Sequence, residues 1–420
     1  MPTKAFQTNL AKYADLIVTV GLNLERGQRL IIYNAATRGV GVHTLPLVSE
    51  IARAAYQAGS PLVDVIWNDE SLIRTRLEHI RHADVQEYPT WHTKGLLDTI
   101  EGGGALLSIH SSDPDLLADL DPELAGLWNQ RHVRDYEPVL VGATVNRMNW
   151  CVVAAAGPRW AKKVYPRLSS EKAEAKLWRT LFRITRADLP DPVAAWTDHI
   201  RELTRRARYL TDRRFTTLRY TGPGTDLTIG LPDGHRWLAA REQTASGHEF
   251  TANLPTEEVF TLPHRLRTEG RVQATLPLVH AGQRIEGLNL SFQGGHVVRA
   301  EARKGEAVLR KLISLDEGAS FLGEVALVPQ DSPVARQKTL FFDSLLDENA
   351  ACHVAIGRGY RTCLPGSERV TDAEFLERGG NIGSTHVDFM IGSSQLDIDG
   401  IERGGAVQPV MRAGEWAFDI

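Results

Sequence analysis

Cysteines and long apolar runs are both scarce in this 420-residue chain. The three cysteines, Cys151, Cys352 and Cys363, are odd in number and form no C-x-x-C pair, so the sequence does not predict a disulfide framework. Such cysteines are typical of a reducing compartment, which favours a cytoplasmic protein. No stretch approaches the roughly 18 consecutive apolar residues of a membrane helix, so we expect no membrane partner.

An excess of charge of either sign is also missing. Lys and Arg number 48 and Asp and Glu 52, a formal net charge of −4, which argues against nucleic acid or an anionic membrane as a partner. The most basic stretch, residues 201–220, is interrupted by Glu202 and Asp212 and carries an apolar stripe. This pattern favours a solvated helix face over a nucleic-acid surface.

The sequence lacks the nucleotide-binding fingerprints G-x-G-x-x-G and the P-loop lysine. The glycines of "EGGGALL" (101–107) precede a strand pattern, which favours a turn that enters a strand. The apolar run at residues 16–22 is short, is closed by Asn23 and Glu25, and has no small-residue cleavage site after it. It therefore predicts a buried helix face and not a signal peptide.

The length and the patterns that are present predict two domains. In the first half, apolar strand patterns alternate with helical ones, which is typical of parallel βαβ units. We expect an N-terminal α/β domain with a parallel sheet over residues 1–190. Its strands are predicted at 29–35, 61–69, 105–114 and 149–158, and a helix is predicted at 42–58.

The pattern of apolar and turn residues changes in the second half of the chain. A helical stretch over 169–212, interrupted at 188–192, leads into short apolar runs separated by Gly, Pro and Asp turns, as in "TTLRYTGPGTDLTIGLPDGH". This spacing predicts a C-terminal, largely antiparallel and β-rich (α+β) domain over residues 191–420, with some helix at 305–315.

One strand pattern in this half carries unusual charge. In "NIGSTHVDFMIGSSQLDIDG" (381–400), alternation places His386 and Asp388 on one face and apolar residues on the other. An imidazole beside a carboxylate can ligate a divalent cation, and a structural hydrogen bond explains the pair equally well. Asp397 and Asp399 suit a turn or a partner that orients a ligand.

Three further stretches place a group that is hard to bury in an apolar context: "TANLPTEEVFTLPH", "SFLGEVALVPQDSP" and "DENAACHVAIGRGY". Each of these residues taken singly has a structural explanation. Glu324 could lie at a strand edge, His353 could be a core histidine with its hydrogen bonds made, and Tyr360 could be an aromatic residue that packs in the core. Taken together with Glu257 or Glu258 and the H-x-D pair, they supply the carboxylates and imidazoles of a centre for two metal ions.

These stretches, in this order, resemble the thermophilic aminopeptidase family of the aminopeptidase T type, whose members are dinuclear metallopeptidases. The resemblance extends from "YADLIVTVGLNLERGQ" to the C-terminus. It implies five metal ligands and a tyrosine near the metals. The implied ligands are Glu258, Glu324, His353, His386 and Asp388, and the tyrosine is Tyr360. The choice of Glu258 over Glu257 rests on the family pattern.

The resemblance predicts a cytoplasmic, homodimeric metallo-aminopeptidase that removes N-terminal residues from peptides with a free N-terminus. Two divalent ions, Zn²⁺, Co²⁺, Mn²⁺ or Mg²⁺, are expected in each chain. We assign metal bridging to Glu324, proton transfer as general base to Glu257 and oxyanion stabilisation to Tyr360. The alternatives are a dinuclear amidohydrolase on non-peptide amides and a non-catalytic metabolite-binding protein.

Overall fold

The computed structural model describes residues 3–280 and 283–420 and divides into two compact units. The first unit runs to His199 and includes Arg241–Pro255, and the second comprises Ile200–Ala240 and Thr256–Ile420. The division at residues 190 and 191 stays a prediction. In the structure, the boundary between the two units falls within helix α8 (Pro192–Arg213). The later segment Arg241–Pro255 packs with the first unit.

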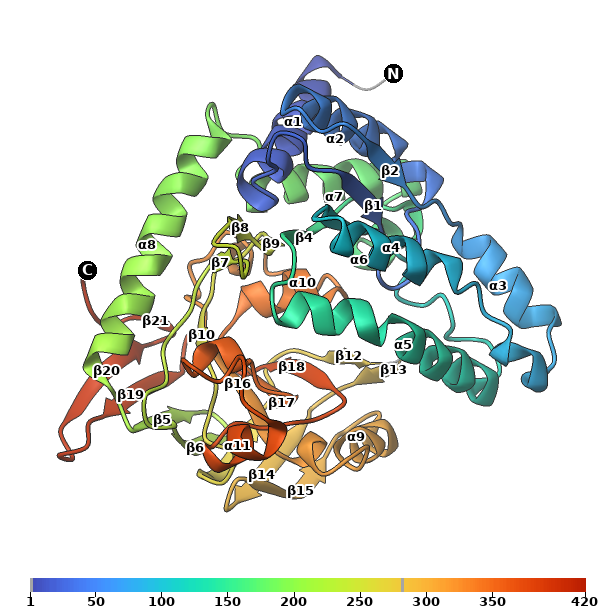
Figure 1. The fold of residues 1–420 in the computed structure, drawn as a ribbon. Helices are drawn as coiled ribbons and strands as arrows, with labels where there is room; N and C mark the ends of the chain where they lie inside the picture. Colours follow the sequence, from blue (N-terminus) through green and yellow to red (C-terminus); the bar gives the residue numbers. More distant parts are fainter. Residues whose placement is uncertain (1–2, 281–282) are drawn as a thin grey trace. The chain divides into compact units, whose positions relative to one another are not determined.

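The first unit is built on a parallel sheet with the strand order β2-β1-β3-β4-β9 (Figure 1). The central strands of this sheet are apolar and largely buried, as expected where both faces are covered. The strands are β1 (Leu30–Tyr33), β2 (Val63–Val65), β3 (Ala105–His110), β4 (Trp150–Ala154) and β9 (Asn253–Leu254), and a hairpin consists of β7 (Arg241–Gln243) and β8 (Glu249–Thr251).

Helices of the first unit alternate with these strands. Helix α1 packs on α2 and α7, whereas α4 packs on α5, β1 and β3. The predicted parallel-sheet α/β architecture is confirmed. The helices are α1 (Lys4–Leu16), α2 (Leu45–Gln57), α3 (Glu70–His79), α4 (Trp91–Glu101), α5 (Pro122–Thr144), α6 (Pro158–Val164) and α7 (Ser170–Ile184), with the π-helical segment η1 (Ile17–Gly21) and the 3₁₀ helices η2 (Val42–Thr44) and η3 (His82–Gln86).

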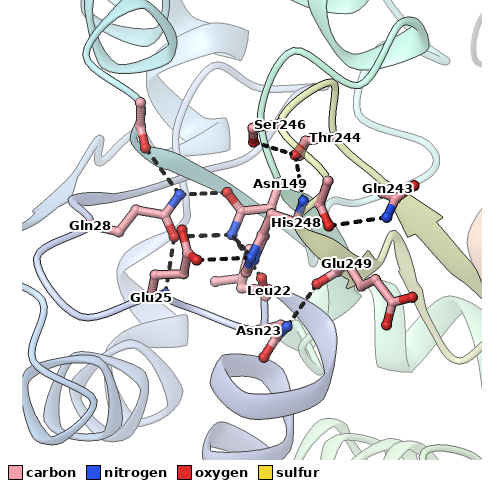
Figure 2. A network of polar contacts seen from close by, with 12 residues as sticks. Leu22, Asn23, Glu25, Gln28, Asn149, Gln243, Thr244, Ser246, His248 and Glu249 are labelled. Carbon is pink, nitrogen blue, oxygen red and sulfur yellow. Dashed lines mark hydrogen bonds and ion pairs between the residues drawn. The ribbon is translucent and has the colours of Figure 1, made fainter.

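A polar network ties the β7–β8 hairpin to the rest of the first unit (Figure 2). The imidazole of His248 lies 3.3 Å from the carboxylate of Glu25 and 3.4 Å from the Asn149 amide. Gln28 donates to the side chain of Asn149 at 2.6 Å, and Asn23 donates to the backbone of Glu249 at 2.8 Å. These contacts join segments that are far apart in the sequence. The predicted series of consecutive βαβ units covers only the N-terminal half of the chain, so it does not include this hairpin.

The second unit holds two main antiparallel sheets, so the predicted β-rich, largely antiparallel character is confirmed. The site sheet has the order β10-β16-β17-β18, and the outer sheet the order β15-β14-β11-β6-β5-β19-β20-β21 (Figure 1). The site sheet comprises β10 (Val259–Thr261), β16 (Leu322–Leu327), β17 (His353–Gly357) and β18 (His386–Met390). The outer sheet comprises β5 (Thr217–Gly222), β6 (Thr225–Gly230), β11 (Thr268–Gln273), β14 (Asn289–Gln293), β15 (His296–Glu301), β19 (Asp397–Ile401), β20 (Val407–Arg412) and β21 (Glu415–Trp416).

Short elements complete the second unit, including a helix close to the one predicted at 305–315. They are α9 (Glu306–Ile313), α10 (Ser344–Asp347), α11 (Asp372–Glu377), the hairpin β12 (Leu278–His280) with β13 (Gln283–Ile285), and the turns η4 (Gly318–Ser320), η5 (Ala335–Gln337), η6 (Glu348–Ala350) and η7 (Arg361–Cys363). In the part of the chain that the structure describes, none of the helices has both the length and the apolarity needed to span a membrane.

Candidate metal centre

The register of the site sheet brings acidic residues of β16 and β18, the two neighbours of β17, to a common row. Glu324 of β16 lies opposite Ala355 of β17, and Ala355 lies opposite Asp388 of β18. Paired residues of neighbouring strands point to the same face of a sheet, so both carboxylates flank a small methyl group. Alanine at the central position leaves space between the two acids.

The same face carries both histidines, because residues two apart in a strand share a face. His353 lies opposite Ala326, and His386 lies opposite Gly357. Each imidazole therefore has a small partner on the adjacent strand. In β18 the alternation expected from the sequence is observed, with His386 and Asp388 half-buried and Val387 and Phe389 buried.

The ligating atoms form two groups that share one residue. Glu258, Glu324 and His353 make the first group, and Glu324, His386 and Asp388 make the second. Within each group, one ligand atom per residue lies within 4.8 Å of the others. The structure thus brings all five predicted ligands together, and Glu324, only 4% exposed, belongs to both groups.

Strand alternation also distinguishes the two consecutive glutamates. Phe260 of β10 pairs with Ala326, so it faces the side that carries Glu324. Glu258 stands two residues before Phe260 and shares its parity, whereas Glu257 does not. Both glutamates are buried, and the backbone N–H of Glu257 donates to the Asn349 side chain at 2.7 Å. Among the residues that the structure describes, Glu257 belongs to neither ligand group.

The two imidazoles make close contacts with carboxylates. Nε2 of His353 lies 3.1 Å from Glu258, and Nε2 of His386 lies 2.8 Å from Glu324 and 3.5 Å from Asp388. Their Nδ1 atoms donate to backbone carbonyls, at 3.1 Å to Ala351 and 2.7 Å to Arg358. These backbone acceptors fix the tautomer in which Nε2 is directed at the carboxylates, as metal-ligating histidines require.

Burial and opposite charge act against each other at this site. Burial alone lowers the pKa of His353, but the hydrogen bond and charge of Glu258 outweigh it and raise that pKa to about 10. Burial raises the pKa of the Glu324 carboxyl to about 7, although His386 acts in the opposite direction. A cation would have to displace these protons, so metal binding strengthens as the pH rises.

The donor set fits divalent metal. Buried carboxylates persist when they are paired, hydrogen-bonded or metal-bound, and here they outnumber the imidazoles beside them. Mixed carboxylate and imidazole ligands suit borderline and hard divalent cations such as Zn²⁺, Co²⁺ and Mn²⁺. A ligand that belongs to two groups is what a bridged pair of cations requires.

Glu348 is an ionisable residue near this centre that sequence reasoning missed. Its pKa lies well above the usual range because of burial first and then the negative charges of Asp388 and Glu258. The available signal was its position in "DENAACH", five residues before His353. An acid in a short turn has no periodicity, so the pattern alone did not distinguish it from an exposed loop residue.

Tyr360 lies beside the ligands. Its ring centroid is 5.0 Å from that of His386 and 5.7 Å from that of Phe260. Burial and the charges of Glu324 and Asp388 hold the pKa of its hydroxyl well above the usual range. The phenol therefore stays protonated at neutral pH and is available as a hydrogen-bond donor.

Asp397 and Asp399 lie in β19 of the outer sheet and belong to neither ligand group. Asp397 accepts a hydrogen bond from the backbone of Ala413 at 2.8 Å, and Asp399 pairs with Arg412. Their observed partners stabilise the end of the β19–β20 pair. The two aspartates therefore do not orient a metal-ligating histidine through these bonds.

Comparisons with known proteins agree with this geometry. The model of a family described as thermophilic metalloprotease (M29) matches residues 6–416. Aminopeptidase T of Thermus aquaticus is 44% identical over 414 residues, which cover 99% of this chain and 100% of that protein. Aminopeptidase AmpS of Bacillus subtilis is 39% identical over 414 residues, with 99% and 100% covered. The solved structure of wild-type AmpT from Thermus thermophilus superposes with a TM-score of 0.91 at 42% identity, covering 98% of this chain and 100% of the other.

Proposed function

Because the chain belongs to the thermophilic metalloprotease (M29) family and is a metal-dependent aminopeptidase, we propose that it removes N-terminal residues from peptides through a water activated by two divalent cations. The observation that carries the two-cation proposal is the presence of Glu324 in both ligand groups. When bound, such cations supply Lewis acidity to water and to the scissile carbonyl.

The residues of the chain have distinct proposed roles. Glu258 and His353 would hold one cation, His386 and Asp388 would hold the other, and Glu324 would be shared between them, because it belongs to both ligand groups. Tyr360 donates its hydroxyl hydrogen to the oxyanion that develops on the scissile carbonyl, since its phenol stays protonated beside the ligands. A free α-amine could occupy a ligand position of a bound cation, whereas an acetylated N-terminus could not, and this would favour cleavage at a free N-terminus.

The proposed partners are peptides with a free N-terminus, and the proposed cofactor is a pair of Zn²⁺, Co²⁺, Mn²⁺ or Mg²⁺ ions. A cytoplasmic homodimer is also proposed. The cytoplasmic location is supported by the cysteine content, since three cysteines without a C-x-x-C pair are typical of a reducing compartment. The homodimer rests on the resemblance to the family.

A two-way comparison tests this function. A free-amine aminoacyl amide and its N-acetylated counterpart are assayed with enzyme that has been dialysed against a chelator and with the same enzyme after addition of each candidate cation. We expect hydrolysis only of the free-amine substrate and only after a cation is restored. Comparable rates on the acetylated substrate would reject recognition of the N-terminus, and full activity in metal-free enzyme would reject the metal mechanism.

The general base is one of two glutamates. Glu257 is the candidate from the sequence, and the charge interactions of Glu348 with Glu258 and Asp388 favour Glu348 as a second candidate. We expect Glu348→Gln to lower kcat by about 10²–10⁴, the usual contribution of a general base, and Glu257→Gln to lower it less. Metal content is measured on both variants. A larger loss of kcat in Glu257→Gln than in Glu348→Gln would identify Glu257 as the general base. Loss of metal from Glu348→Gln would instead identify Glu348 as a ligand.

A further inference from the structure

The orientation of His386 depends on one backbone carbonyl. Its Nδ1 atom donates to the carbonyl of Arg358 at 2.7 Å, which directs Nε2 toward Glu324 and Asp388. Arg358 lies in the segment that joins β17 to Tyr360. The position of this short segment therefore affects both the orientation of His386, a proposed ligand, and the position of Tyr360, the proposed oxyanion donor.

Asn381 contacts the residues on both sides of Arg358. Its side-chain amide donates to the carbonyl of Gly357 at 2.6 Å, and its backbone carbonyl accepts from the N–H of Gly359 at 2.9 Å. The second amide hydrogen is directed at the carbonyl of Gly318, 2.9 Å away, in the turn that precedes β16. Asn381 is only 1% exposed, so water does not compete for these bonds.

The segment has little freedom to adjust by itself. Gly357 has φ 103°, a conformation that favours glycine, and a Cβ atom placed there would lie 2.1 Å from the carbonyl oxygen of Thr385. The N–H of Arg358 donates to that same oxygen at 2.7 Å. Because the backbone is so closely packed, a displacement of the Gly357 carbonyl would be transmitted to the adjacent Arg358 carbonyl.

We propose that Asn381 is a positioning residue for the metal centre. It holds the Gly357–Gly359 segment so that the Arg358 carbonyl orients His386 and the following residue, Tyr360, reaches the ligands. This inference rests on the proposed function, since it assigns His386 and Tyr360 their roles there. Asn381 itself is assigned no contact with metal or substrate.

The chemistry of the side chain explains why asparagine suits this position. Both amide hydrogens are used on carbonyl oxygens, so an acceptor-only carboxylate would face two oxygens and repel them. Leucine has a similar branched shape, although it is larger, and removes both donors without adding charge, which leaves two buried carbonyls without these partners. Serine retains one donor and provides a smaller perturbation.

The test compares Asn381→Asp, Asn381→Leu and Asn381→Ser with Asn289→Asp. Asn289 is a matched control, because its amide also donates to a glycine carbonyl, that of Gly287 at 3.0 Å, but in the outer sheet. Zn²⁺ affinity is measured on folded protein by competition with a chelating dye, and kcat, KM and Tm are measured at saturating Zn²⁺.

We expect Zn²⁺ affinity to fall about 10–100-fold in the Asp and Leu variants, as is usual when the support of a metal ligand is lost, and to fall less in the Ser variant. We expect kcat to fall more than KM changes, because Tyr360 would be misplaced. The control should match the wild type. If the Asp variant does not fold, the Zn²⁺ affinity and kcat of the Leu and Ser variants still test the proposal.

Two other outcomes are distinguishable. Lower Tm with unchanged Zn²⁺ affinity and kcat in Asn381→Leu would make Asn381 a purely structural residue and overturn this inference alone. A wild-type enzyme that binds no divalent cation would overturn the proposed two-cation centre, and this inference with it.

Discussion

Replacing Glu324 by glutamine is expected to remove both cations and nearly all activity together. Glutamine keeps the shape of the side chain but loses the negative charge, and Glu324, itself 4% exposed, is common to both ligand groups. The loss of activity should exceed the roughly 10–100-fold effect of losing a residue that only supports a ligand. Metal content per chain is measured by elemental analysis alongside kcat/KM.

The matched control for this variant is Glu317→Gln. Glu317 is 82% exposed at the side chain, pairs with Arg265, and lies seven residues before Glu324 in the same unit. It should keep wild-type metal content and activity. A Glu324→Gln protein that retains two tightly bound ions per chain would show that Glu324 is not the bridge, whatever its activity.

Tyr360→Phe is expected to lower kcat by about 10²–10³, or roughly 2.7–4 kcal/mol, because only the oxyanion donor is lost. The ring and its packing beside Phe260 remain. Metal content should be unchanged, since Tyr360 is not proposed as a ligand. KM should change little if the hydrogen bond forms mainly in the transition state.

Tyr220→Phe provides the control for this second variant. Tyr220 is fully buried in β5 of the outer sheet, and its hydroxyl has no hydrogen-bond partner among the described residues, so its loss should not affect turnover. Near-normal kcat in a fully metallated Tyr360→Phe enzyme would assign Tyr360 to core packing. Oxyanion stabilisation would then have to come from elsewhere in the centre.

Much of the local structure could be predicted from the sequence. The alternation in "HVDFM" placed His386 and Asp388 on one face, and this alternation is a property of any extended strand. The apolar runs around residues 30, 63, 105 and 150 correspond to β1, β2, β3 and β4. The five proposed ligands were predicted because each polar group interrupts an apolar pattern and because the motifs resemble a known family.

Other features could not be predicted because they depend on contacts between distant residues. The short strand β9 pairs with β4 across about a hundred residues, and two residues carry no recognisable period. Glu348 lies in a turn, and only the folded chain places it near Asp388. The family pattern predicted Glu258 over Glu257, and the pairing of Phe260 with Ala326, which no single segment contains, supports the same choice.

The same distinction applies to the metal centre as a whole. Local alternation and the identity of the side chains determined which residues could bind metal, because strand geometry assigns each residue to a face. The grouping of the ligands, with Glu324 in both sets, required the register of β16, β17 and β18, in which Ala355 separates Glu324 from Asp388. Register is set by the pairing of strands far apart in the chain, so no single segment of the sequence contains it.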